Sequence, residues 1–167
     1  GPLESGAVFL FDSARTTSSG APNPNFGNWR RTYKSPSPVA GDRLGWSLAA
    51  GEKFFAAGAD QFAGSGFGFA LLFDDDTSSV MRTYTSPVTT GALGRFGASV
   101  ACGPGLLPNV IVGAPAQDSP LSPGPGNVYA FNPDATPSVI ATYSESEPFF
   151  GNFGFYVGFI GSSPIVR

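Results

Sequence analysis

The sequence predicts an all-β fold, made of β-propeller blades with four antiparallel strands each and about three blades in the chain. The 23 Gly and 16 Pro among 167 residues are too many for helices of ordinary length. Short segments rich in Val, Ile, Phe and Tyr are bounded by turn residues, which indicates strands. Four types of segment recur in one order, and four strands in about 50 residues is the pattern of a propeller blade.

The first segment type pairs a large apolar residue with glycine and continues as an apolar run. It occurs at residues 44–50, 96–102 and 153–159, and we expect it to form the innermost strand of each blade. The second type is an apolar run that ends in small residues, at 53–60 and 109–115. Its nearly continuous apolar character predicts a strand that is covered on both faces.

The third and fourth segment types predict the two outer strands. The third type follows a Gly-rich loop and again predicts a strand covered on both faces. The fourth type carries Arg and Thr between apolar residues and ends in Ser-Pro in two copies, which predicts a solvent-facing outermost strand. The third type occurs at residues 6–12, 68–74 and 126–132, and the fourth at 31–36, 82–87 and 141–144.

The repeats divide the chain into complete and incomplete blades. Residues 1–5 have the composition of an expression-tag remnant, which leaves 6–167 as the propeller segment. We expect a half-blade, two blades and a second half-blade, at residues 6–36, 41–87, 93–144 and 149–167. Because propellers have four to eight blades, two copies are expected to exchange half-blades in a homodimer with a six-bladed ring. The alternative is that the remaining blades belong to a longer parent protein.

Two of the repeats carry a recognisable pair of motifs. Phe96-Gly97, followed by Gly113-Ala114-Pro115, resembles the FG-GAP repeat of integrin-alpha-type β-propellers. Leu44-Gly45 with Gly58-Ala59-Asp60 resembles a degenerate copy of the same repeat. The resemblance extends over essentially all of residues 6–167. It implies a secreted or cell-surface protein with a role in cell adhesion or protein binding.

Many blades of that family bind calcium in a loop between the first two strands, through Asp or Asn at alternate positions. The corresponding residues here, 51–53 and 103–109, lack that motif, so we expect no cofactor and no metal site there. The one dense carboxylate cluster is Asp74, Asp75 and Asp76. It falls between a third and a fourth strand, where a polar turn is expected, and a cation site is the weaker alternative.

Polar residues flank the innermost and second strands, where we expect a rim for a ligand or partner. Asp60 and Asp118 follow second strands, where we expect carboxylates that cap turns, and a pair of acid/base carboxylates is the weaker alternative. Arg43, Arg95 and Asn152 precede innermost strands. We expect them either to form a solvated rim or to form a polar ring that binds an anionic ligand. The full set is Asp42, Arg43, Asp60, Gln61, Arg95, Gln117, Asp118 and Asn152.

Composition excludes several classes of function. A net charge of −3 makes a nucleic-acid partner unfavourable, and no apolar run approaches the ~18 residues of a membrane span. The absence of histidine excludes Ser-His-Asp catalysis and His-ligated zinc. The single cysteine, Cys102, excludes internal disulfides. Its apolar surroundings predict a buried structural thiol rather than a nucleophile.

The leading interpretation is a non-enzymatic protein-interaction or adhesion module without catalytic residues, which associates with itself through its half-blades. One alternative is a carbohydrate-binding or glycan-hydrolysing propeller that uses Asp60, Asp118 and aromatic side chains. Another is an architectural protein whose function is self-assembly. Aromatic residues in a propeller mostly fill the spaces between blades, and the candidates that could instead stack on sugars are Phe26, Trp29, Phe149, Phe150 and Tyr156.

Overall fold

The fold is known from a computed structural model. It describes residues 1–51, 53–61, 66–88, 94–104, 109–115, 126–132, 134, 136–145, 153–160 and 162–166. Within these ranges the chain forms twelve strands and no helix, and all the strands pair in antiparallel sheets. The all-β prediction is therefore confirmed. The described residues of the single chain do not form a closed ring of sheets.

The strands form four sheets that follow the order of the chain, here called sheets I to IV. Sheet I contains β1 (Val8–Phe11) and β2 (Trp29–Tyr33), and sheet IV contains β11 (Val157–Ile160) and β12 (Ser163–Val166). Sheet II contains β3 (Ser47–Ala50), β4 (Phe54–Ala59), β5 (Phe69–Asp74) and β6 (Val80–Thr85). Sheet III contains β7 (Ser99–Cys102), β8 (Val110–Ala114), β9 (Asn127–Phe131) and β10 (Val139–Ser144). In sheets II and III each strand pairs with the next one along the chain, in the predicted order.

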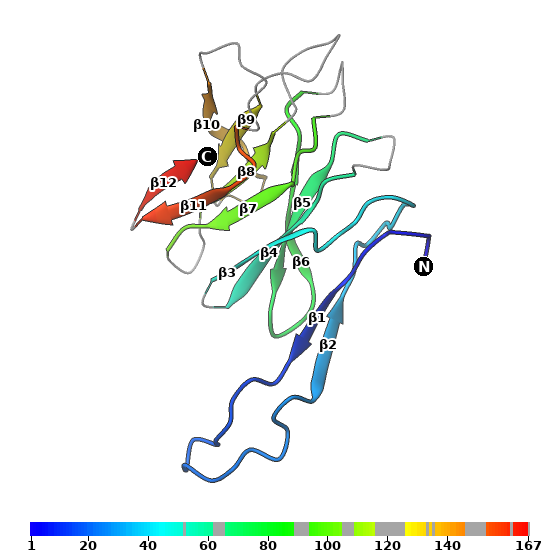
Figure 1. The fold of residues 1–167 in the computed structure, drawn as a ribbon, viewed down its shortest axis with the longest axis vertical. Helices are drawn as coiled ribbons and strands as arrows, with labels where there is room; N and C mark the ends of the chain where they lie inside the picture. The colour runs from blue at the N-terminus through cyan, green and yellow to red at the C-terminus, as the bar shows by residue number, and fades with distance from the viewer. Residues whose placement is uncertain are drawn as a thin grey trace.

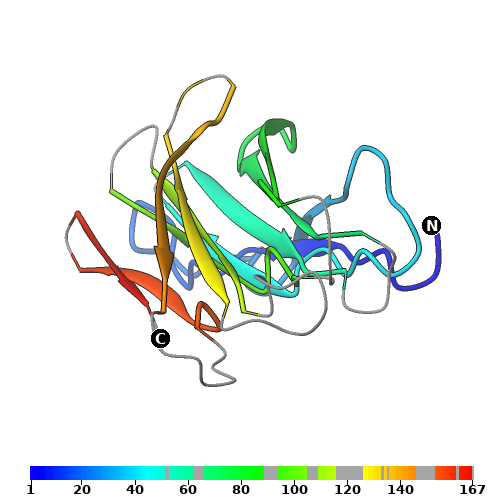
Figure 2. The same cartoon turned by 90° about the horizontal axis from the view of Figure 1, so that it is seen from above.

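The sheets lie in a row in chain order, with sheet I (blue) and sheet IV (red) at its two ends (Figure 1). The view from above also shows sheet IV (red) beside sheet III (yellow) (Figure 2). We call the side of a sheet that is turned toward the following sheet its forward face, and the opposite side its backward face. Within the predicted tag remnant, residues 1–5, the carbonyl groups of residues 3–5 accept the N–H groups of Gly41, Arg43 and Leu44.

The largest core lies between sheets II and III. The forward face of sheet II contributes Ala56, Leu72 and Tyr84, and the backward face of sheet III contributes Tyr129 and Phe131. All are buried, and each large side chain stabilises the fold by about 2 kcal/mol. This core holds the two complete sheets together.

Two smaller cores join the two-stranded sheets to the complete ones. Between sheets I and II, Tyr33 packs edge to face on Phe55 with ring centroids 4.7 Å apart, and Phe55 stacks on Phe73 at 5.2 Å. Between sheets III and IV, Val157 and Phe159 of β11 pack on a cluster that includes Ile111, Val128 and Ala130. Each two-stranded sheet is therefore anchored through one face only.

Sheet I departs from the prediction for the third segment type. Both faces of β1 were expected to be covered, but burial alternates along the strand. Val8 and Leu10 pack on sheet II, whereas Phe9 and Phe11 are exposed on the backward face. The physical reason is that no sheet of the described chain lies against that face. The strand β2 also begins at Trp29, two residues before the predicted segment.

A repeated contact locks each complete sheet to the next one. The Ser47 hydroxyl donates to the carbonyl of Gly97 at 2.9 Å, and a Cβ on Gly58 would lie 2.0 Å from that same oxygen. In the next repeat the Ser99 hydroxyl donates to the Gly154 carbonyl at 2.6 Å. Gly113 takes the position of Gly58 there, because a Cβ on Gly113 would lie against the same Gly154 oxygen. We call each set of three residues a serine–glycine latch. The glycine on the second strand is needed because the backbone of the next sheet occupies the space of a side chain.

Candidate functional site

Two equivalent turns position the arginines of the predicted rim. Arg43 and Arg95 have left-handed backbones, with φ of 58° and 53°, and each precedes an apolar residue and a glycine that enter a first strand. The Arg43 carbonyl accepts the N–H of Trp46, and the Arg95 carbonyl accepts the N–H of Ala98. The repeat therefore places the two arginines at the same position in successive sheets.

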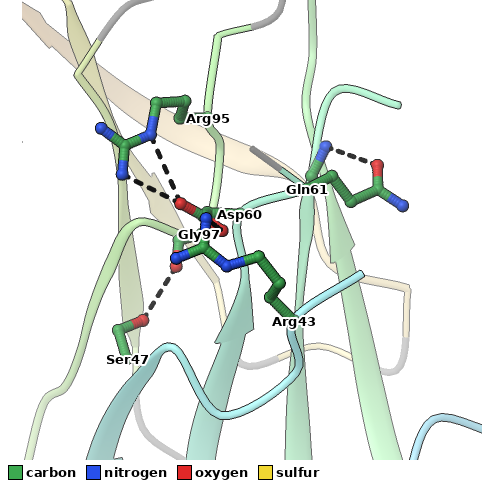
Figure 3. Close-up of polar contacts among 7 residues, drawn as sticks. Arg43, Ser47, Asp60, Gln61, Arg95 and Gly97 are labelled. Atoms are coloured by element: carbon green, nitrogen blue, oxygen red, sulfur yellow. Dashed lines mark hydrogen bonds and ion pairs between the residues drawn. The ribbon is translucent and has the colours of Figure 1, made fainter. Parts of the chain in front are cut away.

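Both arginines converge on one carboxylate, Asp60, which directly follows β4 (Figure 3). Arg43 Nη1 lies 3.5 Å from Oδ1 of Asp60, within the same repeat. Arg95, from the following repeat, donates from Nη2 at 3.0 Å and from Nε at 3.3 Å to Oδ2. Asp60 is buried, while each arginine side chain is about one-fifth exposed. Asp60 thus joins two sheets and holds two guanidinium groups at the surface above it.

A second buried carboxylate, Asp42, organises the loop that precedes Arg43. It accepts the Val39 N–H at 2.7 Å and the Gln61 side-chain amide at 2.6 Å. The side-chain carbonyl of Gln61 in turn accepts the N–H of Gly68 at 3.0 Å, just before β5. Asp42, Arg43, Asp60, Gln61 and Arg95 therefore form one connected cluster, which we call the rim cluster. Its two carboxylates balance its two guanidinium groups in formal charge.

A concave surface of about 390 Å³ lies along the first strands β3, β7 and β11, next to the rim cluster. Trp46 and Tyr156 are exposed on it, and the Arg43 guanidinium lies 3.7 Å from the centre of the Trp46 ring. Sugar sites require polar groups that fix the orientation of the ligand. Two hydroxyl groups of this surface, those of Ser47 and Ser99, already donate to backbone carbonyls. The carbohydrate alternative stays an untested prediction.

Several predicted residues cannot be placed in this cluster. Gln117, Asp118 and Asn152 of the rim, and Phe149 and Phe150 of the aromatic set, lie outside the described residues. The pairing of Asp60 with Asp118 is thus an untested prediction. The remaining aromatic candidates, Phe26, Trp29 and Tyr156, are all exposed.

The three consecutive aspartates form the turn between β5 and β6. One oxygen of Asp74 accepts the N–H groups of Asp76 and Thr77 at 2.9 and 2.7 Å, and the Thr77 hydroxyl at 3.0 Å. These hydrogen bonds, mainly those from Thr77, lower the pKa of Asp74. The carboxylate thus caps a polar turn, as expected. Among the residues that the structure describes, no group of three or more acidic, Cys or His side chains is placed to hold a metal ion.

Cys102 lies at the end of β7, where its thiol donates to the carbonyl of Ala49 in the preceding sheet at 3.6 Å. Burial raises the pKa of Cys102 to about 11, which outweighs the opposing effect of a hydrogen bond with the backbone of Ala56. Because the thiolate is the reactive form, we expect the folded chain at pH 8 to react with a disulfide reagent about two orders of magnitude more slowly than the urea-unfolded chain. The thiol is half-buried rather than fully buried as predicted, and equal rates, measured by thiol titration, would contradict this position.

The serine–glycine latches were not identified from the sequence. Their signal is present in the repeats, because Ser47 and Ser99 both follow the glycine of the first segment type by two residues. Tyr156 takes that position in the third copy, in sheet IV. The change coincides with the absence of a following sheet in the described chain.

No family model matches this chain, and a search of curated proteins finds no match either. A membrane-spanning helix of sufficient length and apolar character is also missing from the part of the chain that the structure describes.

Proposed function

We propose that the chain is a non-enzymatic protein-interaction module built of propeller blades, of the FG-GAP kind, which binds protein through its two-stranded sheets. The proposed setting is a secreted or cell-surface protein with a role in adhesion. This setting rests on the resemblance of the repeats alone. In the proposal, sheets I and IV are half-blades, and the surfaces they leave open are where protein binds.

The proposal rests on a difference in solvent exposure between residues at equivalent positions of the repeats. Phe9 occupies the same repeat position as Leu71 and Tyr129, which are 2% and 3% exposed, yet Phe9 is 58% exposed. Phe11, equivalent to the fully buried Phe73, is 53% exposed. Both lie on the backward face of sheet I, and Trp29 beside Phe11 in the sheet is exposed as well. Clustered large apolar side chains on a surface are characteristic of protein-binding sites.

The rim cluster supports a binding role rather than a catalytic one. An acid/base carboxylate must reach a substrate. Asp60 is buried beneath two arginines, and Asp42 is buried with both of its oxygens accepting hydrogen bonds. The partly exposed guanidinium groups of Arg43 and Arg95, on a rigid scaffold, are suited to contacts with polar groups of a protein partner.

The proposal is tested with the double variant Phe9→Ser, Phe11→Ser. We expect the unmodified chain to associate reversibly with increasing concentration in sedimentation velocity, and we expect the variant to sediment as a monomer. The control is Phe26→Ser, which changes a similarly exposed aromatic residue in the loop between β1 and β2. Association of the double variant equal to that of the control would contradict the proposed binding surface.

A further inference from the structure

We propose that the protein bound by the two-stranded sheets is a second copy of this chain, in a reciprocal arrangement. Sheet IV of each copy completes sheet I of the other into a four-stranded sheet. This inference rests on the proposed function and specifies its partner. It follows from the order of the strands, from their register and from the sizes of the side chains on the faces that would meet.

The two incomplete sheets contain complementary strands. By repeat equivalence, β1 and β2 correspond to the third and fourth strands of sheet II, while β11 and β12 correspond to its first and second strands. Among the described residues no strand pairs with the outer edge of β12 or with the inner edge of β1. Open edges of this kind bind further strands readily. Joining β12 to β1 of a second copy restores the order found in sheets II and III.

The repeats also define the register of that pairing. Ala57 of β4 lies opposite Leu71 of β5, and Val112 of β8 lies opposite Tyr129 of β9. The equivalent residues at the junction are Val166 of β12 and Phe9 of the second copy. Side chains that are opposite in a sheet share a face, and here both residues belong to backward faces. Pro164, two residues before Val166, has no N–H group, so this ladder contains one donor fewer than the intact ones.

A groove in the chain marks where the incoming strands would lie. It measures about 300 Å³ and is lined by β1, by β3 and by Phe54 and Phe55 at the start of β4. Leu48 in its wall is 55% exposed, whereas its equivalent in sheet III, Val100, is 6% exposed because sheet II covers it. The first two strands of a completed sheet I would cover Leu48 in the same way.

Sheet IV offers the matching surface. Its forward face, the side turned away from sheet III, exposes Tyr156, Ile160 and Ile165. A hollow of about 170 Å³ lies around Gly158. In the intact contact between sheets II and III, Val100 belongs to the same core as Ala49, the residue equivalent to Gly158. At the junction the larger Leu48 would face the smaller Gly158. This compensation in size favours a second copy over an unrelated partner.

The outer half of the junction is matched in the same manner. Phe9 and Phe11 of one copy would face the forward side of sheet III in the other copy, where Ala130 and the half-buried Ala141 and Tyr143 lie. Within the chain, the equivalent residues Tyr129 and Phe131 already pack on the forward face of sheet II. Two copies then contain four intact sheets and two completed ones. Six blades is within the range of closed propellers.

The test uses two variants that damage opposite halves of the junction. Variant A is Phe9→Ser with Phe11→Ser, and variant B is Ile160→Ser with Ile165→Ser. All four side chains are exposed in the single chain, so each variant is expected to keep the unfolding transition of the unmodified monomer. We expect neither variant to dimerise alone, because both junctions are damaged. An equimolar mixture is expected to form a 1:1 complex, because one of its two junctions is native.

Each result of the mixing experiment, read by sedimentation velocity or native mass spectrometry, decides one question. A 1:1 complex in the mixture supports reciprocal completion. A mixture that equals the sum of two monomers overturns it, as does variant A or B dimerising like the unmodified chain. If the unmodified chain dimerises but the mixture shows no complex, self-association stands and this arrangement falls. If the unmodified chain is itself monomeric, both proposals fail.

Discussion

Replacing Gly58 by alanine is expected to lower the free energy of unfolding by about 3 kcal/mol, with a decrease in Tm of about 9 °C. The new methyl group would lie 2.0 Å from the carbonyl oxygen of Gly97 and 2.3 Å from the hydroxyl of Ser47. The first of these atoms is backbone of the neighbouring sheet, which cannot turn aside as a side chain can. Gly113→Ala is expected to have the same effect, through Gly154 and Ser99. Thermal unfolding monitored by circular dichroism measures both.

The matched control is Gly103→Ala. This glycine also lies next to a strand and has no left-handed backbone, but its nearest neighbour is 3.3 Å from the added carbon. We expect a change of no more than about 1 kcal/mol. If Gly58→Ala were no more destabilising than Gly103→Ala, the close contact between successive sheets would be refuted.

Replacing Asp60 by asparagine is expected to lower the free energy of unfolding by about 3 kcal/mol. The substitution keeps the shape of the side chain but leaves two guanidinium groups without their shared buried carboxylate. Because Arg95 comes from the following repeat, the loss also loosens the contact between sheets II and III. Urea denaturation measures the change in the free energy of unfolding.

Asp76→Asn is the control for charge alone. Asp76 is an exposed turn residue, so we expect a change within about 0.5 kcal/mol. Combining Asp60→Asn with Arg95→Gln should cost less than the sum of the single variants, because each removes the same ion pair. Strict additivity would argue against the shared contact.

The strands and their order could be predicted because the same alternation of apolar segments and turn residues occurs in successive repeats. The apolar runs at 53–60 and 109–115 contain the observed strands β4 and β8, and both strands are largely buried. The turn at Asp74 was also predictable, because a carboxylate that caps a polar turn is a local arrangement. These features depend on local patterns that occur in two or three copies.

Contacts between repeats were harder to predict. A repeat pattern reports what each segment resembles, not which neighbour it touches. Asp60 was expected to cap a turn, with an acid/base pair with Asp118 as the alternative, whereas in the fold it accepts a hydrogen bond from Arg95 of the next repeat. The alternating burial of β1 was missed for a related reason. The sequence of residues 6–12 matches that of its covered equivalents, and only the position of sheet I at the end of the row leaves Phe9 exposed.

The most direct test of the account is the mass of the unmodified chain in solution, measured by light scattering across the micromolar concentration range. Reciprocal completion of sheets I and IV predicts a dimer with twice the 17.2 kDa of the chain, and no larger species, because the ring is closed. A folded monomer of 17.2 kDa at every concentration would contradict the account. An open-ended series of larger species would contradict closure of the ring.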